Sequence, residues 1–130
     1  SDLLSFDGNT APYLQYAHAR IRSIFRRAGV DGEAHLGEIH LGEAKERALA
    51  LRLLGFEQAV NEALERFSPH RLCTYLFDLA QDFTGFYEAC PVLRADDERD
   101  RQSRLALCDL TARILQRGLA LLGIDAPDRM

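Results

Sequence analysis

Apolar residues recur at steps of three and four along most of this 130-residue chain, which is the period of α-helices buried on one side. The first such stretch follows Asn9 and Thr10, whose side-chain oxygens can accept hydrogen bonds from the first N–H groups of a helix. Pro12 is tolerated in a first turn, and Gly29 should stop the helix in the left-handed conformation. The stripe expected to be buried is Leu14, Ala17, Ile21, Ile24, Phe25 and Ala28.

Three further helices are predicted in the middle of the chain, and the first two span residues 43–54 and 56–67. In the first, the residues predicted to face inward are Ala44, Ala48, Leu51 and Leu54. In the second, they are Phe56, Val60, Ala63, Leu64 and Phe67. Ser68 should cap the third helix with Pro69 in its first turn, and Pro91 should end it. Its apolar stripe is Leu72, Tyr75, Leu76, Leu79, Phe83, Phe86 and Tyr87.

The last predicted helix spans residues 99–122 and is the most apolar. Two apolar stripes indicate that it packs on two sides, as a central helix of a bundle does. They are Leu105, Cys108, Ala112, Leu115, Leu119 and Leu122 on one side, and Leu107, Leu110, Ile114 and Leu121 on the other. Residues 30–40 are punctuated by glycine, as in a loop, and no alternating strand pattern of useful length appears. The sequence therefore predicts an all-α, single-domain bundle of about five helices.

The composition fits a folded, water-soluble chain, with 47% hydrophobic and 28% charged residues. No apolar run reaches membrane-spanning length and no signal sequence is recognisable, so we expect no membrane partner. The three cysteines are widely spaced and odd in number, which favours buried, reduced thiols in a cytoplasmic protein.

The net charge of −4 argues mildly against non-specific binding to nucleic acid, but it does not exclude a local basic patch. Arg20, Arg22, Arg26 and Arg27 cluster on the first helix without an acid among them, and we expect them to contact phosphates. The charges of residues 94–104 give a different picture. The arginines there alternate with acids and are expected to form a solvated, salt-bridged face: Arg99, Arg101 and Arg104. On the helix predicted for residues 43–54, Glu43 and Arg47 are spaced for an i,i+4 ion pair.

A second stripe of the first helix lies roughly 110° round the helix wheel from the apolar one. It is formed by Tyr13, Tyr16, Arg20, Ser23 and Arg27. Unpaired RNA bases are recognised by aromatic and guanidinium platforms, combined with hydrogen bonds to the base edges. The stripe fits such a platform. In the alternative, the two tyrosines cover the edge of the core and keep their hydroxyls in water.

Three stretches resemble a known family. The first is residues 8–20 (GNTAPYLQYAHAR), and the second is residues 75–93, which include FY at 86–87 and CPVL at 90–93. The third is residues 104–130, which include RLAL, LALLGI and the final Arg129-Met130. Together they resemble the C-terminal, DALR-type anticodon-binding domain of class I arginyl-tRNA synthetases. The resemblance covers nearly the whole chain and is weakest over residues 30–68. Because such a synthetase is several times longer, residues 1–130 resemble an excised C-terminal piece.

The resemblance implies a helical bundle that binds the anticodon loop of arginine tRNA. It adds Tyr87 and the terminal Met130 to the candidate RNA contacts, beside the tyrosines and arginines of the first helix. Arginine codons share a central G, so the base most worth reading is the central cytosine of the anticodon. The parent enzyme is expected to join arginine to tRNA with ATP and Mg²⁺ in a catalytic domain of the same chain, and to be a monomer. The piece itself is expected to hold no catalytic residue, cofactor or metal.

Two other functions are weighed against this one. The first is a helical protein–protein interaction module without RNA binding, which would require an exposed apolar groove. The second is a metal site from His35, Glu38, His40 and Glu43, whose spacing matches no ligand set we can defend. No serine or cysteine has a recognisable base partner, so the sequence gives no support for covalent catalysis.

Overall fold

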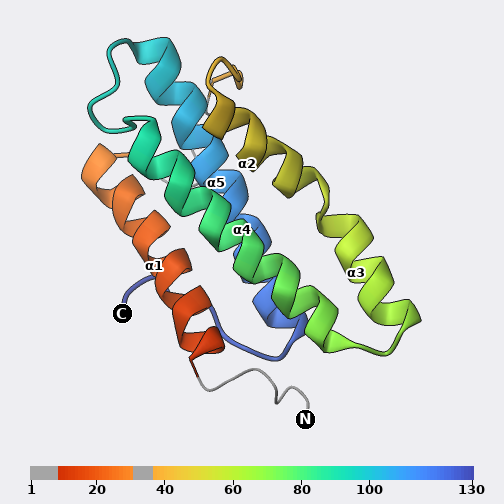
Figure 1. Cartoon of the computed structure of the whole chain (residues 1–130). Helices are drawn as coiled ribbons and strands as arrows, with labels where there is room; N and C mark the ends of the chain where they lie inside the picture. Colours follow the sequence, from red (N-terminus) through yellow and green to blue (C-terminus); the bar gives the residue numbers. More distant parts are fainter. Residues whose placement is uncertain (1–8, 31–36) are drawn as a thin grey trace.

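The computed structural model describes residues 9–30 and 37–130, and these fold into five α-helices (Figure 1). In chain order the helices are α1 (Thr10–Ala28), α2 (Ala44–Leu54), α3 (Phe56–Glu65), α4 (Pro69–Ala89) and α5 (Glu98–Leu121). The part of the chain that the structure describes contains no strand. The predicted all-α fold is therefore confirmed, and each helix begins and ends within a few residues of its predicted bounds.

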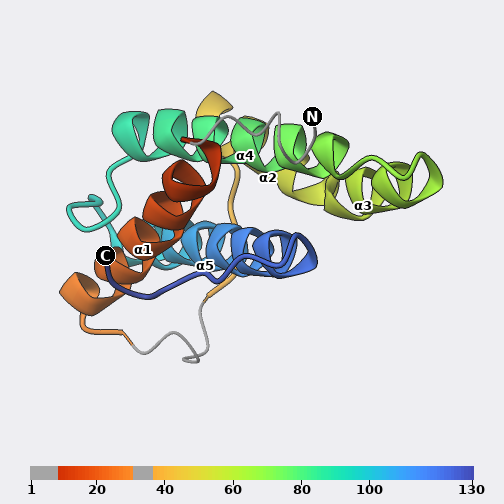
Figure 2. The ribbon, with the colours of Figure 1, turned by 90° about the horizontal axis from the view of Figure 1, so that it is seen from below.

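The long helices α4 and α5 form the centre of the bundle (Figures 1 and 2). Helix α1 packs against both α5 and α4, and α2 packs against the same two helices. Helix α3 contacts α4 and projects beyond the rest of the bundle, as Figure 2 shows. The largest fully buried side chains are Leu14, Ile21, Ile24, Leu49, Leu76, Leu79, Phe83, Phe86, Leu105, Leu107, Leu115 and Leu119.

The two ends of α1 differ in how well they were predicted. Gly29 adopts a φ of 72° and its N–H points to the carbonyls of Phe25 and Arg26, which is the predicted left-handed stop. Asn9 is the N-cap residue, but its side chain makes no capping hydrogen bond, so that part of the prediction was wrong. The backbone of Asn9 is in the helical region, whereas a capping side chain usually needs an extended one.

The inward stripe predicted for α2 was wrong. Leu51 and Leu54 are exposed, Leu54 to 80%, and Ala44 and Ala48 are exposed as well. The buried face instead carries Glu46, Leu49 and Leu53. A hydrophobic pattern misses this face because one of its three buried positions is a carboxylate.

That carboxylate pairs with Arg104, which also corrects the prediction of a solvated arginine face. Arg104 is buried, and its Nε donates to Glu46 Oε2 at 2.9 Å while Nη1 donates to the Pro91 carbonyl at 2.7 Å. Arg101 donates to the carbonyl of Ala28 at 3.0 Å and so holds the end of α1. Arg99 matches the prediction, with its side chain exposed, and Arg101 matches it in part, since it is partly exposed and pairs with Glu98 at 3.3 Å.

Other details also depart from the sequence patterns. Arg47 does not pair with Glu43 but donates to the carbonyls of Leu41 and Gly42, each at 3.0 Å. In α3, Ala63 is half-buried as predicted, as are Phe56 and Val60. Two other residues predicted to face inward from this stretch, Leu64 and Phe67, are exposed. In the second apolar stripe predicted for α5, Leu110 and Leu121 are exposed as well. Leu64 lies in the last turn of α3, which projects from the bundle, and Phe67 follows the end of that helix at Glu65. Neither side chain therefore reaches the core.

Helix α4 begins where the sequence predicted it, and α5 begins with a side-chain cap. Ser68 occupies the N-cap of α4 with Pro69 in the first turn, although the serine side chain makes no capping bond. Asp97 caps α5 by accepting a hydrogen bond from the Asp100 N–H at 2.8 Å. The apolar stripe predicted for α4 is buried as far as Phe86 and half-buried at Tyr87.

The loop predicted over residues 30–40 lies partly outside the described residues. His35, one of the candidate metal ligands, is among the residues that are not described. Within the described ranges, no cluster of three His, Cys, Asp or Glu side chains could hold a metal ion. No helix in those ranges is long and apolar enough to cross a membrane. All three cysteines are free and buried, as predicted.

Candidate nucleic-acid interface

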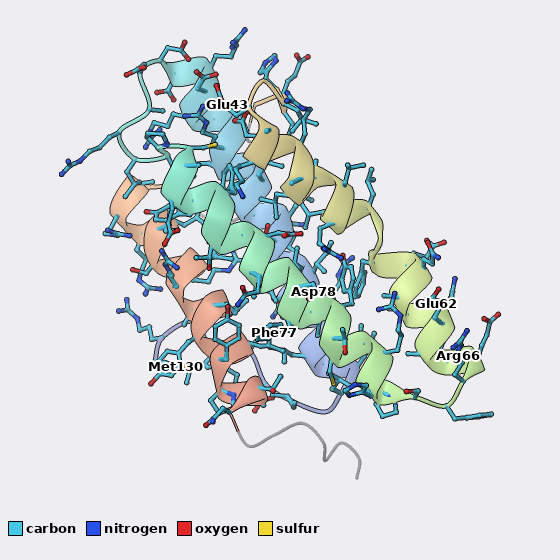
Figure 3. All side chains as sticks on the ribbon, viewed as in Figure 1. Glu43, Glu62, Arg66, Phe77, Asp78 and Met130 are labelled. Atoms are coloured by element: carbon cyan, nitrogen blue, oxygen red, sulfur yellow. The ribbon has the colours of Figure 1, made fainter. Side chains whose placement is uncertain are left out.

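The exposed face of α1 and the C-terminal tail, residues 123–130, together form a shallow pocket of about 270 Å³. The helix contributes Tyr16, Ala19, Arg20, Ser23 and Arg26, and the tail contributes Arg129 and Met130. Figure 3 shows Met130 beside α1. The sequence therefore predicted four of these seven residues, although they come from opposite ends of the chain.

Tyr16 is the most accessible aromatic side chain of this pocket. Its exposed fraction is 59%, and Met130 next to it is 58% exposed. A pocket of this volume is smaller than the ~300–1,000 Å³ typical of sites for small molecules. An exposed ring beside a shallow notch is better suited to one group of a larger ligand, such as an unstacked base.

Tyr87 of α4 contacts two of the predicted arginines of α1. The guanidinium carbon of Arg20 lies 5.1 Å from the centre of the Tyr87 ring, and Arg27 Nη2 donates to the Tyr87 hydroxyl at 3.5 Å. The ring also stacks on Phe83, with 5.8 Å between the centroids and an interplanar angle of 17°. Tyr87 is thus held against the core and in turn holds Arg20 and Arg27 toward solvent.

Tyr13 lies one turn before Tyr16 and is packed against α4. Its ring centroid is 5.3 Å from that of Phe77, and its hydroxyl accepts a hydrogen bond from Gln81 Nε2 at 3.1 Å. Figure 3 shows Phe77 on the side of α4 that faces α1. Tyr13 therefore fits the alternative of a tyrosine at the core edge, while Tyr16 remains open to a ligand.

Arg22 is not brought together with the other arginines. Its Nη1 lies 3.5 Å from Asp109 Oδ1 on α5, and its guanidinium lies 5.8 Å from the centre of the Phe25 ring. Asp109 is shared with Arg113, whose Nε donates to Oδ2 at 2.8 Å. Because Arg22 lies on the side of α1 that faces α5, its guanidinium pairs with Asp109 and links the two helices.

The pocket is basic although the chain as a whole is acidic. Three of its seven lining residues are arginines and none is acidic, whereas the chain carries a net charge of −4. Such local polarisation attracts a polyanion to one face of a protein that would otherwise repel it. The basic face includes Arg27 as well, through its contact with Tyr87.

The described cysteines offer no nucleophile near this face or elsewhere. Burial raises the pKa of Cys73 to about 11 and that of Cys108 to about 12, and it raises the pKa of Cys90 as well. A thiol must ionise to attack, so these groups are inert at neutral pH. The arrangement is suited to binding rather than to covalent chemistry.

Comparison with known proteins identifies the family. The family model described as the DALR anticodon binding domain matches residues 14–130. The chain belongs to this family. Curated relatives of this DALR domain include the arginine–tRNA ligases of Thermobifida fusca, 58% identical over 128 residues, and of Proteus mirabilis, 52% identical over 128 residues. Each match covers 98% of this chain and 22% of the relative.

Solved structures show the same fold. The DALR domain superposes on Thermus thermophilus arginyl-tRNA synthetase with a TM-score of 0.83 and 46% identity, over 96% of this chain and 22% of the other. The Plasmodium falciparum arginyl-tRNA synthetase gives a TM-score of 0.83 and 34% identity, over 98% of this chain and 22% of the other. The chain thus spans about a fifth of the length of the proteins it matches.

Three residues of the DALR domain's pocket were not among the predicted contacts. Ser23 lies on the tyrosine–arginine stripe, so the helical period could have indicated it, and Arg129 adjoins the predicted Met130. Ala19 is buried and carries no polar group, so no sequence signal distinguished it from a core residue.

Proposed function

We propose that this DALR domain binds the anticodon loop of arginine tRNA through the face formed by α1, Tyr87 and the C-terminal tail. The observation that carries the proposal is an exposed Tyr16 set among arginines in a shallow basic pocket. Loops of RNA present unstacked bases and closely spaced phosphates, which need an aromatic platform and guanidinium groups together.

Each side chain has a proposed role in that complex. Tyr16 stacks on an unpaired base, while Arg20, Arg26 and Arg27 pair with phosphates on either side of it. Tyr87 orients two of these arginines. Tyr13 forms the wall of the site toward α4, and Arg22 is left out because Asp109 holds it.

The base read in the site is proposed to be the central cytosine of the anticodon. Cytosine presents an N4 donor and an O2 acceptor, and backbone groups near the aromatic platform can meet both.

The domain's part in catalysis is proposed to be indirect. The relatives are arginine–tRNA ligases about five times as long as the matched region, so ATP, Mg²⁺ and the chemistry of aminoacylation would belong to the remainder of such a protein. This domain would supply tRNA affinity and selectivity for the arginine anticodon.

An amide NMR titration tests the proposal with two anticodon stem-loops, one of the arginine type and one with its central cytosine replaced. We expect shifts at Tyr16, Arg20 and Arg26 with the arginine stem-loop, and at least tenfold weaker binding of the other, the order of one mismatched base contact. Equal affinity for both would contradict base reading. Absence of binding by either would contradict RNA binding by this chain.

Two variants give a matched comparison. Tyr16→Ala removes the stacking ring and should weaken binding of the arginine stem-loop about fivefold to a hundredfold, whereas Tyr16→Phe should stay within about twofold of wild type. Arg99→Gln is the charge control, because its side chain is exposed on α5 away from the pocket. If Arg99→Gln weakened binding as much as Arg26→Gln, the proposed face would be wrong.

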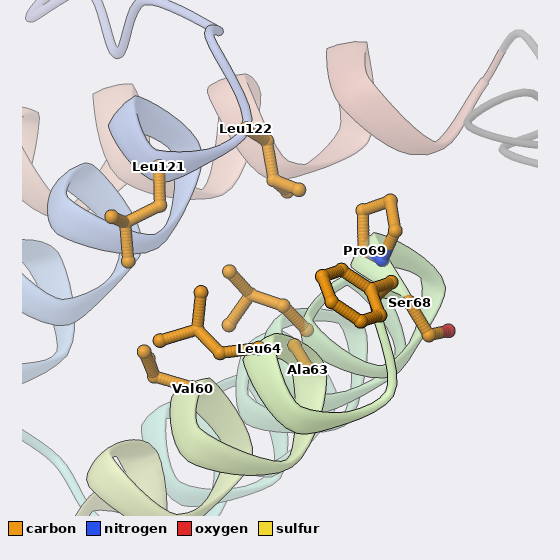
Figure 4. A pocket seen from close by; sticks show the side chains of 9 residues that line it. Val60, Ala63, Leu64, Ser68, Pro69, Leu121 and Leu122 are labelled. Carbon is orange, nitrogen blue, oxygen red and sulfur yellow. The ribbon is translucent and has the colours of Figure 1, made fainter.

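A protein–protein interaction module without RNA binding is the second candidate, and one observation favours it. An apolar pocket of about 390 Å³ lies between α3 and the end of α5 (Figure 4). Its apolar lining includes Val60, Ala63, Leu64, Phe67, Leu72, Leu121 and Leu122. Phe67 is 94% exposed and has a φ of 49°, a strained conformation for a bulky residue. Binding that depends on Leu64 and Leu121 but not on Tyr16 would support this candidate instead.

A further inference from the structure

The C-terminal tail returns from the end of α5 and runs along α1 (Figure 2). Three side chains of α1 donate to three tail carbonyls. Gln15 Nε2 bonds the Asp125 carbonyl at 2.8 Å, and Arg26 Nη1 bonds the Asp128 carbonyl at 3.2 Å. Between them, His18 Nδ1 lies 3.0 Å from the Pro127 carbonyl. The tail is therefore fixed by side-chain contacts at three points along α1, directly before Arg129 and Met130 enter the pocket.

His18 differs from the other two donors because it is buried, with only 1% of its surface exposed. A carbonyl oxygen can only accept, so the Nδ1 atom of His18 must carry the hydrogen in this contact. In the neutral ring the Nε2 atom is then an acceptor, and it is buried without a hydrogen-bond partner among the residues that the structure describes. Protonation would place a second N–H and a positive charge at that buried, unpartnered atom.

We propose that His18 is a positioning residue that latches the C-terminal tail: the neutral ring holds Pro127 and so keeps Met130 beside Tyr16, and protonation releases the tail. The effect on RNA rests on the proposed function, since it requires Met130 or Arg129 to contribute to the anticodon site. The latch itself does not.

Burial of the ring sets this direction, while the nearby charges oppose one another. Burial lowers the pKa of His18 from its ordinary value near 6.5, the bond to the Pro127 carbonyl raises it, nearby Arg22 lowers it, and Asp128 of the tail raises it. Arg22 is itself paired with Asp109 of α5. In the released tail the ring returns toward its ordinary pKa. Docking is therefore strongest above pH 6.5 and weakens as the pH falls below it toward the lowered value, by up to about tenfold per pH unit.

Met130 is the only methionine in the chain, so its methyl group is a single, unambiguous NMR probe of the tail. With ¹³C-labelled methionine, we expect the methyl signal to move toward the position of a free methionine as the pH falls from 8 to 5. Its midpoint should coincide with that of the His18 ring protons. A methyl signal that stays constant while His18 titrates would overturn the proposal.

Variants separate the latch from general acid sensitivity. His18→Asn keeps an N–H close to the position of Nδ1 but does not titrate, so its tail should stay docked throughout the range. His18→Ala removes the donor and should release the tail at every pH. His70→Asn changes an exposed histidine of α4 and should behave as wild type. If His18→Ala proves unfolded by circular dichroism, His18→Asn alone decides: a pH response equal to that of wild type overturns the latch.

Binding of the arginine stem-loop at pH 7.5 and 5.5 then tests the link to RNA. The wild type should lose more affinity at the lower pH than His18→Asn does, by up to about tenfold, and the comparison cancels titration of the RNA itself. Equal losses, with the methyl signal still responding, would overturn the claim that the latch serves RNA binding. Absence of RNA binding at both pH values, with the methyl signal responding, would contradict the proposed function and leave the latch intact.

Discussion

Among single residues, Tyr87 connects the core to two arginines of α1. Phe83 supports one part of its ring, while Arg20 and Arg27 approach the ring and the hydroxyl. A cation held against an aromatic ring near the surface gains about 0.5–1 kcal/mol. That is enough to favour one orientation of a long, flexible side chain before RNA arrives.

Two substitutions at Tyr87 should therefore differ. Tyr87→Phe keeps the ring and loses only a hydrogen bond of 3.5 Å, so RNA affinity should change by less than about twofold. Tyr87→Leu removes the contact with Arg20 and should weaken binding about threefold to fivefold. Fluorescence anisotropy with the arginine stem-loop measures both. Equal affinities for the two variants would show that the ring does not orient Arg20.

The buried pair of Glu46 and Arg104 is the residue-scale feature that the sequence hid most completely. The two positions are 58 residues apart, and Arg104 stands in a run of charges that is otherwise exposed. Neither helical period nor charge pattern contains the information that these two side chains meet. Only the packing of α2 against α5 supplies it.

Breaking this pair should cost far more than breaking an exposed one. Glu46→Gln leaves the buried Arg104 without a counter-charge and should lower the free energy of unfolding by about 3–5 kcal/mol. Glu62→Gln removes a 2.7 Å pair with Arg71 that is partly exposed, and it should cost far less than Glu46→Gln. Urea denaturation gives both values. Similar losses would mean that burial does not set the strength of these pairs.

At the scale of helices, α5 carries a glycine where the Leu76 side chain of α4 packs against it. A Cβ atom added at Gly118 would lie 2.6 Å from Leu76 Cδ2, closer than real contacts allow. Gly85 of α4 is also within a helix, but a Cβ there would meet only the flexible end of Lys45, at 3.6 Å or more. Packing therefore requires glycine at position 118 of α5, whereas it does not require glycine at position 85 of α4.

Alanine at these two positions should have opposite effects. Gly118→Ala should destabilise the fold by about 1–2 kcal/mol, because overpacking against Leu76 outweighs the roughly 1 kcal/mol gained in helix propensity. Gly85→Ala should stabilise it by up to about 1 kcal/mol. Thermal unfolding followed by circular dichroism measures the two shifts. A stabilising Gly118→Ala would show that the helices can separate at little cost.

Helix positions could be predicted from sequence better than helix faces. The long helices α1 and α4 have wide apolar stripes that leave one orientation, and most of their buried residues were predicted, although His18 and Ala19 of α1 were not. The short helices α2 and α3 lie at the margin of the bundle and have apolar residues on more than one side. The face that each of these two helices buries is set by its packing against α4, and this packing leaves Leu51, Leu54 and Leu64 exposed.

At the scale of the whole molecule, the candidate site joins segments that are distant in the chain. The stripe on α1 indicated Tyr16 and Arg20, because both belong to one helix and follow its period. The contributions of Tyr87 and Met130 came from family resemblance and not from any local pattern. The hydrogen bonds that set the tail against α1 link residues more than 100 positions apart, beyond the reach of local signals.

The charge distribution predicts a salt-dependent interaction with RNA. The logarithm of the association constant should fall linearly with the logarithm of salt concentration, and each of Arg20→Gln, Arg26→Gln and Arg27→Gln should reduce the slope by about 0.7–1. The substitution Arg99→Gln should leave the slope unchanged, since it lies outside the pocket. Slopes that fall equally for all four variants would indicate attraction to net charge rather than contact at one face.

The burial of all three cysteines makes this chain a convenient host for a chemical label. Thiol reagents attack the thiolate, and the native thiols are both shielded and slow to ionise. A cysteine introduced at an exposed position such as Gln116 would be the fast-reacting thiol, without removal of any natural one. A fluorophore could then report on RNA, while the slow modification of Cys73, Cys90 and Cys108 would separately record how often the core opens.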